Sequence, residues 1–283
     1  MRTLRSRIAA RSPGRSRKPS SALRRIGLFV LLGLGAVVLG GCQAPTFGAF
    51  RGATVQGHDE FKLWFGTVVA GLVVAAFVWA LIFWTIIRYR RRNESIPRQF
   101  HEHTAVEIIY TVLPLLIVLV LFYFTVVTEN EEDAISHPSE IVNVLAYQWG
   151  WKFTYENSAG VKQGVTIQTS AEPKLLAQPA ISSQYPQMVL PVGVETEIVL
   201  TSHDVIHGFY IPAFNYSRYA LPGVVNTLPL TPNVIGVYPA QCTQFCGLYH
   251  SEMLFSVRVE SQANFERWLT AQQIAQSASG VGA

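Results

Sequence analysis

Charged residues are scarce in this sequence, and the two signs are kept apart. Asp, Glu, Lys and Arg make up 14% of the 283 residues, whereas about 25% is usual in a soluble domain. Residues 1–25 contain nine basic side chains and no acidic one, and residues 129–283 contain 13 acids against 6 bases. The acidic C-terminal part argues against nucleic-acid binding. The low charge, with a mean hydropathy of +0.26, favours a membrane protein.

Cysteine is also rare. The chain has Cys42, Cys242 and Cys246, and an odd number of cysteines cannot all pair with one another. The C-x-x-C-H sequence that attaches a c-type haem does not occur, and no internal repeat is visible. These absences exclude a covalently attached haem and a repeat architecture, and they leave Cys42 with a separate role.

The N-terminus has the order of a lipoprotein signal peptide. Basic residues are followed by the apolar run IGLFVLLGLGAVVLGGC, residues 26–42, which has the length of a signal-peptide core. Its last four residues, Leu-Gly-Gly-Cys, resemble a bacterial lipobox. We therefore expect a signal peptide over residues 1–41, cleaved before Cys42, whose sulfur would carry a diacylglycerol. Residues 42–62 would follow outside the cytoplasm. The alternative is a short membrane anchor that contains an ordinary cysteine.

Two uncharged runs, Leu63–Ile87 and Ile108–Thr128, are long enough to cross a bilayer, which takes about 20 residues. Together they predict a transmembrane hairpin over residues 63–128. The connecting loop, residues 88–107, is basic, and such loops stay in the cytoplasm. Its five arginines are Arg88, Arg90, Arg91, Arg92 and Arg98. The acidic C-terminal part should then lie on the outer face of a bacterial cell membrane.

The sequence pattern of residues 129–260 is typical of a β domain. Short runs rich in Val, Ile and aromatic residues, such as ETEIVLTS and LFSVRVE, are separated by Pro, Gly, Asn and Ser. This pattern predicts an antiparallel sandwich or barrel. Residues 261–283 should form a C-terminal helix and tail.

The segment AQCTQFCGLYHSEM places Cys242, Cys246, His250 and Met253 close together. The spacing could line one face of a helix, but Gly247 and the flanking strand-like runs favour a loop between two strands. A Cys242–Cys246 disulfide would leave the histidine and the methionine unexplained. Thiolate, imidazole and thioether together suit copper better than zinc.

Two cysteines suggest two copper ions, and a second histidine is then required, one for each metal. Upstream, SHDVIHGF contains His203 and His207 near the predicted end of a strand.

Over residues 61–269 the chain resembles subunit II of the haem–copper cytochrome c oxidases. That family carries C-x-E-x-C-G-x-x-H-x-x-M, with D-V-x-H upstream. The matching residues here are Asp204, Val205, His207, Cys242, Cys246, Gly247, His250 and Met253, with Gln244 in place of the glutamate.

The resemblance implies a cupredoxin-like Greek-key domain that holds the binuclear copper centre CuA. Cys242 and Cys246 would bridge the two ions, and His207 and His250 would each bind one. Met253 and the backbone oxygen of Gln244 would be the remaining ligands, and His203 would be a surface residue. The family's glutamate also reaches a magnesium ion. The neutral amide of Gln244 is a weaker partner for a hard cation, which weakens the case for magnesium here.

Two further positions match the family. AYQWGWKFTY resembles its aromatic stretch, so Trp149 would be the residue where electrons enter. The alternative is that these aromatics alternate along one face of a strand. VEIIYTVLP resembles the start of its second membrane helix, where Glu107 would stand at the mouth of a proton path. The alternative is a carboxylate that caps the helix near the lipid headgroups.

The implied activity is that of the electron-accepting subunit of a proton-translocating cytochrome c oxidase. The chain would take electrons from soluble or membrane-bound cytochrome c and pass them to subunit I, in a complex that also contains subunit III. One alternative is a copper-delivery assembly lipoprotein, which also has C-x-x-x-C but lacks the hairpin. Others are a quinol oxidase subunit II, which lacks copper ligands, and a non-catalytic lipoprotein whose sandwich domain has a disulfide.

Overall fold

The computed structural model describes residues 45–91, 96, 99, 101–136, 138–157, 162–168 and 185–278. The predicted signal peptide and Cys42 lie outside the described residues, and the cleavage and acylation expected there stay predictions.

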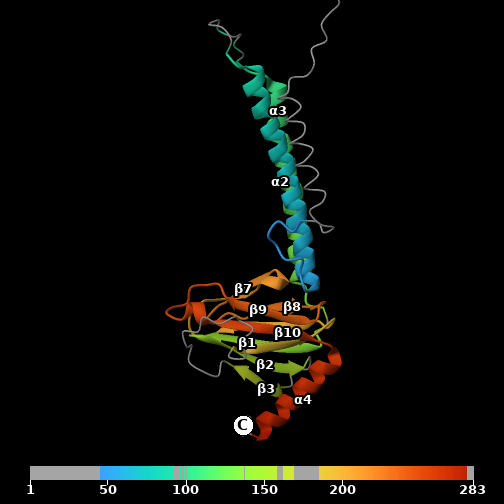
Figure 1. Cartoon of the computed structure of the whole chain (residues 1–283), viewed down its shortest axis with the longest axis vertical. Coiled ribbons are helices and arrows are strands. Elements are labelled where there is room, and N and C mark those ends of the chain that lie inside the picture. Colours follow the sequence, from blue (N-terminus) through green and yellow to red (C-terminus); the bar gives the residue numbers. More distant parts are fainter. Residues whose placement is uncertain are drawn as a thin grey trace, which may run out of the picture. The chain divides into compact units, whose positions relative to one another are not determined.

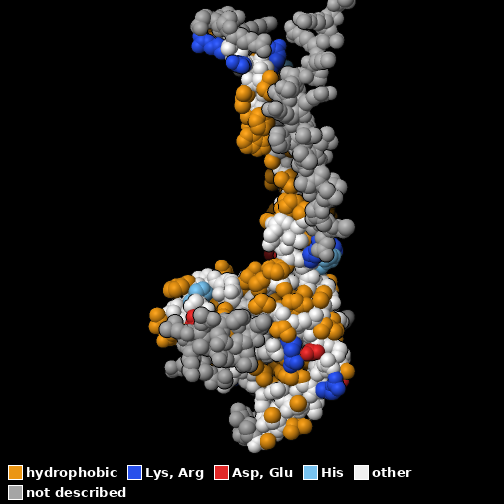
Figure 2. Space-filling view, viewed as in Figure 1, with side chains coloured by type: hydrophobic (Ala, Val, Ile, Leu, Met, Phe, Trp, Pro, Cys, Tyr) orange, Lys and Arg blue, Asp and Glu red, His pale blue; other side chains and the backbone are white. Residues whose placement is uncertain are grey.

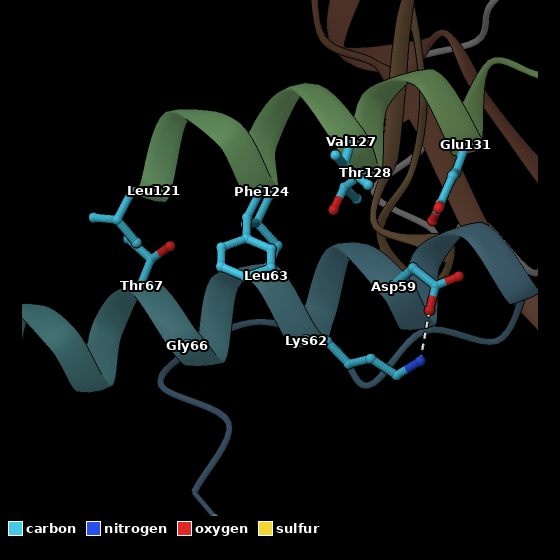
Figure 3. A pocket seen from close by; sticks show the side chains of 10 residues that line it. All are labelled: Asp59, Lys62, Leu63, Gly66, Thr67, Leu121, Phe124, Val127, Thr128 and Glu131. Carbon is cyan, nitrogen blue, oxygen red and sulfur yellow. Dashed lines mark hydrogen bonds and ion pairs between the residues drawn. The ribbon is translucent and has the colours of Figure 1, made fainter. Parts of the chain in front are cut away.

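Two long helices form the hairpin, α2 (Val55–Arg88) and α3 (Thr104–Glu132). Both are long and apolar enough to cross a membrane, and Figure 2 shows hydrophobic side chains along them and Lys and Arg near the connecting loop. The helices run side by side in opposite directions (Figure 1). Near the β domain, Leu63 and Thr67 of α2 face Leu121 and Phe124 of α3 (Figure 3).

Helix α2 begins eight residues before the predicted span. Its first two turns contain Gln56, Asp59 and Glu60, so hydropathy alone does not detect them. The side chain of Thr54 caps the helix by accepting a hydrogen bond from the Gly57 amide at 2.9 Å, which satisfies a donor that a helix start leaves free. The polar turns therefore continue the membrane helix towards the β domain.

The β domain is a sandwich of two five-stranded sheets, ordered β3-β2-β1-β5-β8 and β4-β10-β9-β6-β7. The strands are β1 (Glu140–Tyr147), β2 (Gly150–Asn157), β3 (Lys162–Gln168), β4 (Gln187–Pro191), β5 (Thr196–Ser202), β6 (His207–Ile211), β7 (Tyr216–Ala220), β8 (Asn226–Leu230), β9 (Gly236–Cys242) and β10 (Leu254–Glu260). Two short 3-10 helices, η1 (Pro212–Phe214) and η2 (His250–Glu252), and the C-terminal helix α4 (Gln262–Ala278) complete it.

The predicted sandwich is confirmed, but the prediction of antiparallel strands is wrong for two pairs. β1 pairs with β5 in parallel, and so does β4 with β10. Parallel neighbours need a crossover connection rather than a tight turn, and side-chain alternation along a strand does not report which kind of connection follows.

Alternating side chains of β1 and β2 build the core between the sheets. Trp151, Phe153 and Tyr155 are fully buried on one face of β2, as period-two alternation requires. Trp149 is not part of this stripe, because it lies in the turn between β1 and β2. The strand alternative for Trp149 is therefore wrong, and its side chain is placed by the turn.

The residues just before α2 attach the hairpin to the β domain. The Ala53 amide donates to the Ala213 carbonyl at 2.8 Å, and the Asn215 side chain donates to the Gly57 carbonyl at 2.9 Å. A Cβ atom on Gly57 would lie 2.0 Å from the carbonyl oxygen of Phe214. Only glycine permits this approach of the helix to the domain.

Candidate metal centre

Cys242 ends β9 and Leu254 begins β10, so the residues between them form a loop at one end of the sandwich. The amide of Cys242 donates a hydrogen bond to the carbonyl of Met253 at 3.0 Å, which holds the two ends of the loop together. Gly247 has φ of +120°, a conformation that favours glycine. The predicted loop between two strands is confirmed, and the helix-face alternative is wrong.

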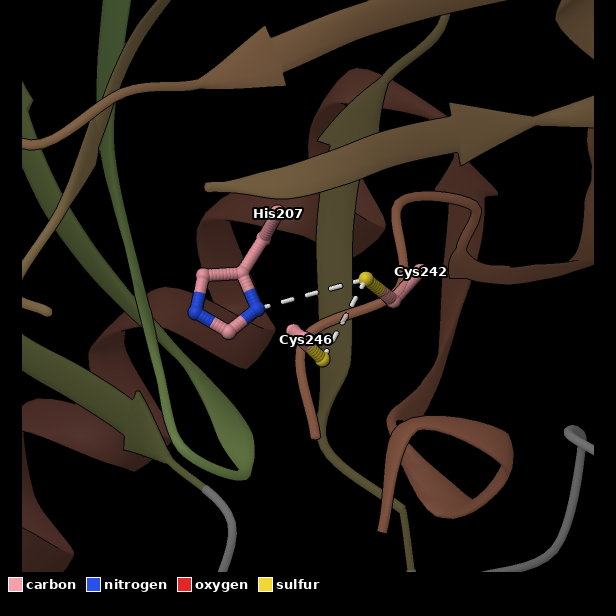
Figure 4. Close-up of side chains that lie close together, drawn as sticks. All are labelled: His207, Cys242 and Cys246. Atoms are coloured by element: carbon pink, nitrogen blue, oxygen red, sulfur yellow. Dashed lines mark hydrogen bonds between the residues drawn. The ribbon is translucent and has the colours of Figure 1, made fainter. Parts of the chain in front are cut away.

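His207, the first residue of β6, joins this loop from 35 residues earlier in the chain. β6 lies beside β9, with Phe209 opposite Cys242, so the imidazole reaches the sulfurs (Figure 4). A Cβ atom on Gly208 would lie 2.4 Å from Oγ1 of Thr243. Glycine at that position lets the strand and the loop approach closely.

Five side chains converge around two sulfur atoms. Sγ of Cys242 lies 3.9 Å from Sγ of Cys246, far beyond the ~2.05 Å of a disulfide bond. Nδ1 of His207 lies 4.0 Å from the first sulfur, and Nδ1 of His250 lies 3.6 Å from the second. Sδ of Met253 lies 3.8 Å from Sγ of Cys246. His207, Cys242 and Cys246 are buried and close enough to hold a metal ion together.

Two backbone groups also lie beside the sulfur of Cys242. The carbonyl oxygen of Gln244 lies 3.3 Å from its sulfur, and the amide of Gly208 donates to the same sulfur at 3.5 Å. The backbone oxygen of Gln244 thus lies beside the thiol of Cys242, and its role as a metal ligand stays a prediction.

The two thiols differ in acidity. Burial opposes ionisation of Cys242, but hydrogen bonds from His207 and Gly208 bring its pKa below the ordinary value. Burial raises the pKa of Cys246 to about 12, and the charge on Cys242 adds to this rise. Two thiolates so close together repel each other, so both can ionise only with cations beside them. The donor set of two thiolates, two imidazoles and a thioether is soft and fits copper.

Comparison with known proteins identifies the family of this chain. Residues 52–126 match the family model of the cytochrome c oxidase subunit II transmembrane domain, and residues 141–260 match that of its periplasmic domain. Cytochrome c oxidase subunit 2 of Mycobacterium tuberculosis is 31% identical over 300 residues, covering 89% of this chain and 82% of the relative. The chain belongs to the cytochrome c oxidase subunit II family.

Other members of the subunit II family are similar to the same extent. The probable subunit 2 of Streptomyces avermitilis is 32% identical, over 90% of this chain and 89% of the relative. Among solved structures, the periplasmic domain of subunit II of Bradyrhizobium japonicum is 24% identical, covers 50% of this chain and 99% of that domain, and has a TM-score of 0.43.

Trp149, for which the resemblance predicts electron entry, lies directly against the loop of residues 243–253, here named the cysteine loop. Its Nε1 donates to the carbonyl of Cys246 at 3.1 Å, and its ring meets that of Tyr249 edge-on at 5.0 Å. Gln148 donates to the same carbonyl at 2.7 Å. The sequence alone did not indicate this contact of Gln148 with the loop, although Gln148 stands next to Trp149 in the aromatic motif.

Two other residues named in the sequence analysis lie apart from the sulfurs. Glu107 is exposed in the first turn of α3, where its Oε1 accepts a hydrogen bond from the His103 amide at 3.0 Å. This contact agrees with the helix-capping alternative, and a role in proton transfer stays a prediction. His203 is exposed, and it is not among the residues that gather at the centre.

Proposed function

We propose that this chain accepts electrons from reduced cytochrome c at a CuA centre and passes them to subunit I of an oxidase that reduces oxygen to water and pumps protons. Family membership supports a role as a component of a respiratory oxidase complex. The finer proposal rests on one observation. Two imidazoles and a thioether surround two unpaired thiols, whose sulfur atoms are 3.9 Å apart. Neither a disulfide nor a quinol oxidase subunit accounts for this donor set.

The residues that would hold the copper pair are His207, Cys242, Cys246, His250 and Met253, with the backbone oxygen of Gln244. When bound, the two ions share one electron, and a rigid cage keeps the geometry nearly fixed on oxidation. Three of the residues that would form that cage are buried: Cys242 is 5% exposed, Cys246 is 3% exposed and Met253 is 1% exposed. Burial excludes water and holds the ligands by close packing. The uncharged Gln244 side chain offers no ionic contact to magnesium.

Trp149 is proposed as the residue where electrons enter. Its side chain is half-buried and therefore partly accessible, while the indole N–H donates to the carbonyl of Cys246, a proposed copper ligand. The path from the surface to the centre then runs through one ring and one hydrogen bond. Asp204 and Glu252, near this surface, are candidates to attract a basic cytochrome c by electrostatic steering.

The transmembrane hairpin supports the proposed location in a membrane and the proposed neighbouring subunits. The hairpin and the periplasmic-type domain are those of a membrane protein with an extracytoplasmic domain. We place it in a bacterial cell membrane, with subunits I and III as neighbours. The apolar side chains of α2 and α3 are exposed in the isolated chain, and lipid or other subunits would cover them.

The test uses the assembled oxidase with Trp149→Phe. Oxidation of reduced cytochrome c should slow by roughly tenfold or more, about 1.4 kcal/mol in activation free energy, because phenylalanine lacks the N–H and the larger ring. Copper content should not change. Tyr147→Phe, at the end of β1, is the matched control and should keep the normal rate. An unchanged rate in the Trp149 variant would remove this residue from the electron path.

A further inference from the structure

Glu132, the last residue of α3, has a buried carboxyl group where the hairpin meets the β domain. The residue is 9% exposed. Among the residues that the structure describes, none donates a hydrogen bond to its Oε1 atom. The group lines a cavity of about 220 Å³ formed by α2, α3 and β7. A carboxylate oxygen that is buried without a donor makes the ionised form of the group costly.

Arg218, whose positive charge favours ionisation of Glu132, is already engaged by other groups. Arg218 of β7 contacts the carboxylate of Asp133 and also donates to the hydroxyl of Tyr216 at 3.2 Å. Lys62 of α2 pairs with Asp59 at 2.6 Å.

Acids dominate the rest of the surroundings. Glu60 and Asp59 of α2 and Asp133 all repel a negative charge on Glu132, and Glu129 lines the same cavity. The field at this point therefore disfavours an ionised Glu132.

The side chains of Glu60 and Glu132 line the same cavity, where their carboxyl groups can hydrogen-bond to each other. Ionised carboxylates only accept hydrogen bonds, so a bond between two of them requires a proton on one. We propose that Glu60 and Glu132 share one proton at neutral pH and together form a proton-binding site between the β-domain ends of α2 and α3. Glu60 is exposed, so the proton can reach the pair from solvent.

A metal ion is a less suitable occupant of this cavity. Hard cations such as calcium require six or more oxygen ligands at close range. Among the described residues, the side chains close enough together to hold a metal are those of the copper centre, not these acids. The proton-binding site is independent of the copper proposal, because it shares no residue with the metal ligands.

Infrared difference spectroscopy of the full-length protein in detergent tests whether Glu60 and Glu132 share a proton. The wild type should show the carbonyl band of a protonated carboxyl group at neutral pH. Glu132→Gln and Glu60→Gln should both lose it, because the new amide donates to the remaining carboxylate and allows that group to ionise. Glu131→Gln, one residue away and exposed, is the matched control and should keep the band.

The far-ultraviolet circular dichroism spectrum of each variant, compared with that of the wild type, reports whether the variant has folded. Absence of the band in a folded wild type, or its persistence in folded Glu132→Gln, would overturn the proposal. Loss of the wild-type band on addition of calcium chloride or sodium chloride alone would also overturn it, since the site would then be a cation site.

Discussion

Asp204 holds His207 from the side of the ring opposite the sulfurs. Its Oδ1 lies 2.9 Å from Nε2 of His207, while Nδ1 of the same ring faces Sγ of Cys242. The amides of Gln148 and Val205 each donate to Asp204 at 2.7 Å. Burial opposes ionisation of this carboxyl, but the bonds from His207 and the two amides lower its pKa. An ionised Asp204 therefore fixes the proton on Nε2 and leaves Nδ1 free to bind a metal.

This relationship predicts the effect of Asp204→Asn. The amide is a weaker acceptor and can turn its NH₂ group towards the ring, so His207 loses its fixed orientation. Copper affinity should fall by about 10–100-fold, the usual effect of removing such a partner. A titration against a copper chelator measures it. Glu252→Gln, in the cysteine loop itself, should leave the affinity unchanged. Equal affinities for the wild type and Asp204→Asn would show that the contact does not orient the ligand.

Copper binding should depend on pH through Cys246. Because the pKa of this thiol is raised to about 12, it keeps its proton throughout the neutral range in the copper-free protein. Copper binds the thiolate and must displace that proton. Affinity should therefore rise with pH, by about tenfold per unit for each proton released. Chelator competition at several neutral pH values measures the slope. An affinity independent of pH would mean that both thiols are already ionised without metal.

The approach of α2 to the β domain predicts a strong glycine requirement. Gly57→Ala places a methyl group against the carbonyl of Phe214, and such overpacking typically costs about 1–3 kcal/mol. The segment before α2 should become more sensitive to proteolysis. Gly66→Ala, in the same helix with no atom near its Cβ position, should have no such effect. Similar digestion of both variants would contradict this tight contact.

The sequence predicts the cysteine loop and the hairpin well because both have local signals. Uncharged runs of the right length mark Leu63–Ile87 and Ile108–Thr128, and these lie within α2 and α3. The full helices are longer, because backbone hydrogen bonds continue through polar turns that hydropathy ignores. Cys242, Cys246, His250 and Met253 are close in sequence, so their convergence needs only a loop.

Contacts between distant segments are less accessible from the sequence. The orientation of His207 by Asp204 depends on how the end of β5 bends into β6, which spacing alone does not give. Aromatic residues recur at every second position from Tyr147 to Tyr155, and this spacing in the sequence does not reveal that the chain turns at Trp149. The burial of Glu132 depends on α2 and β7, which are distant in the sequence. From the sequence alone, Glu132 follows an apolar run and is expected to be an ordinary surface charge.

The most direct test is the copper content and electron paramagnetic resonance spectrum of the purified full-length protein after copper loading. We expect two copper ions per chain and a seven-line hyperfine pattern, because one electron would be shared equally by two nuclei of spin three-halves. Cys246→Ser should bind at most one copper and lose that pattern, whereas Ser251→Ala, in the same loop, should keep it. One copper per wild-type chain, or a four-line spectrum from it, would contradict the account.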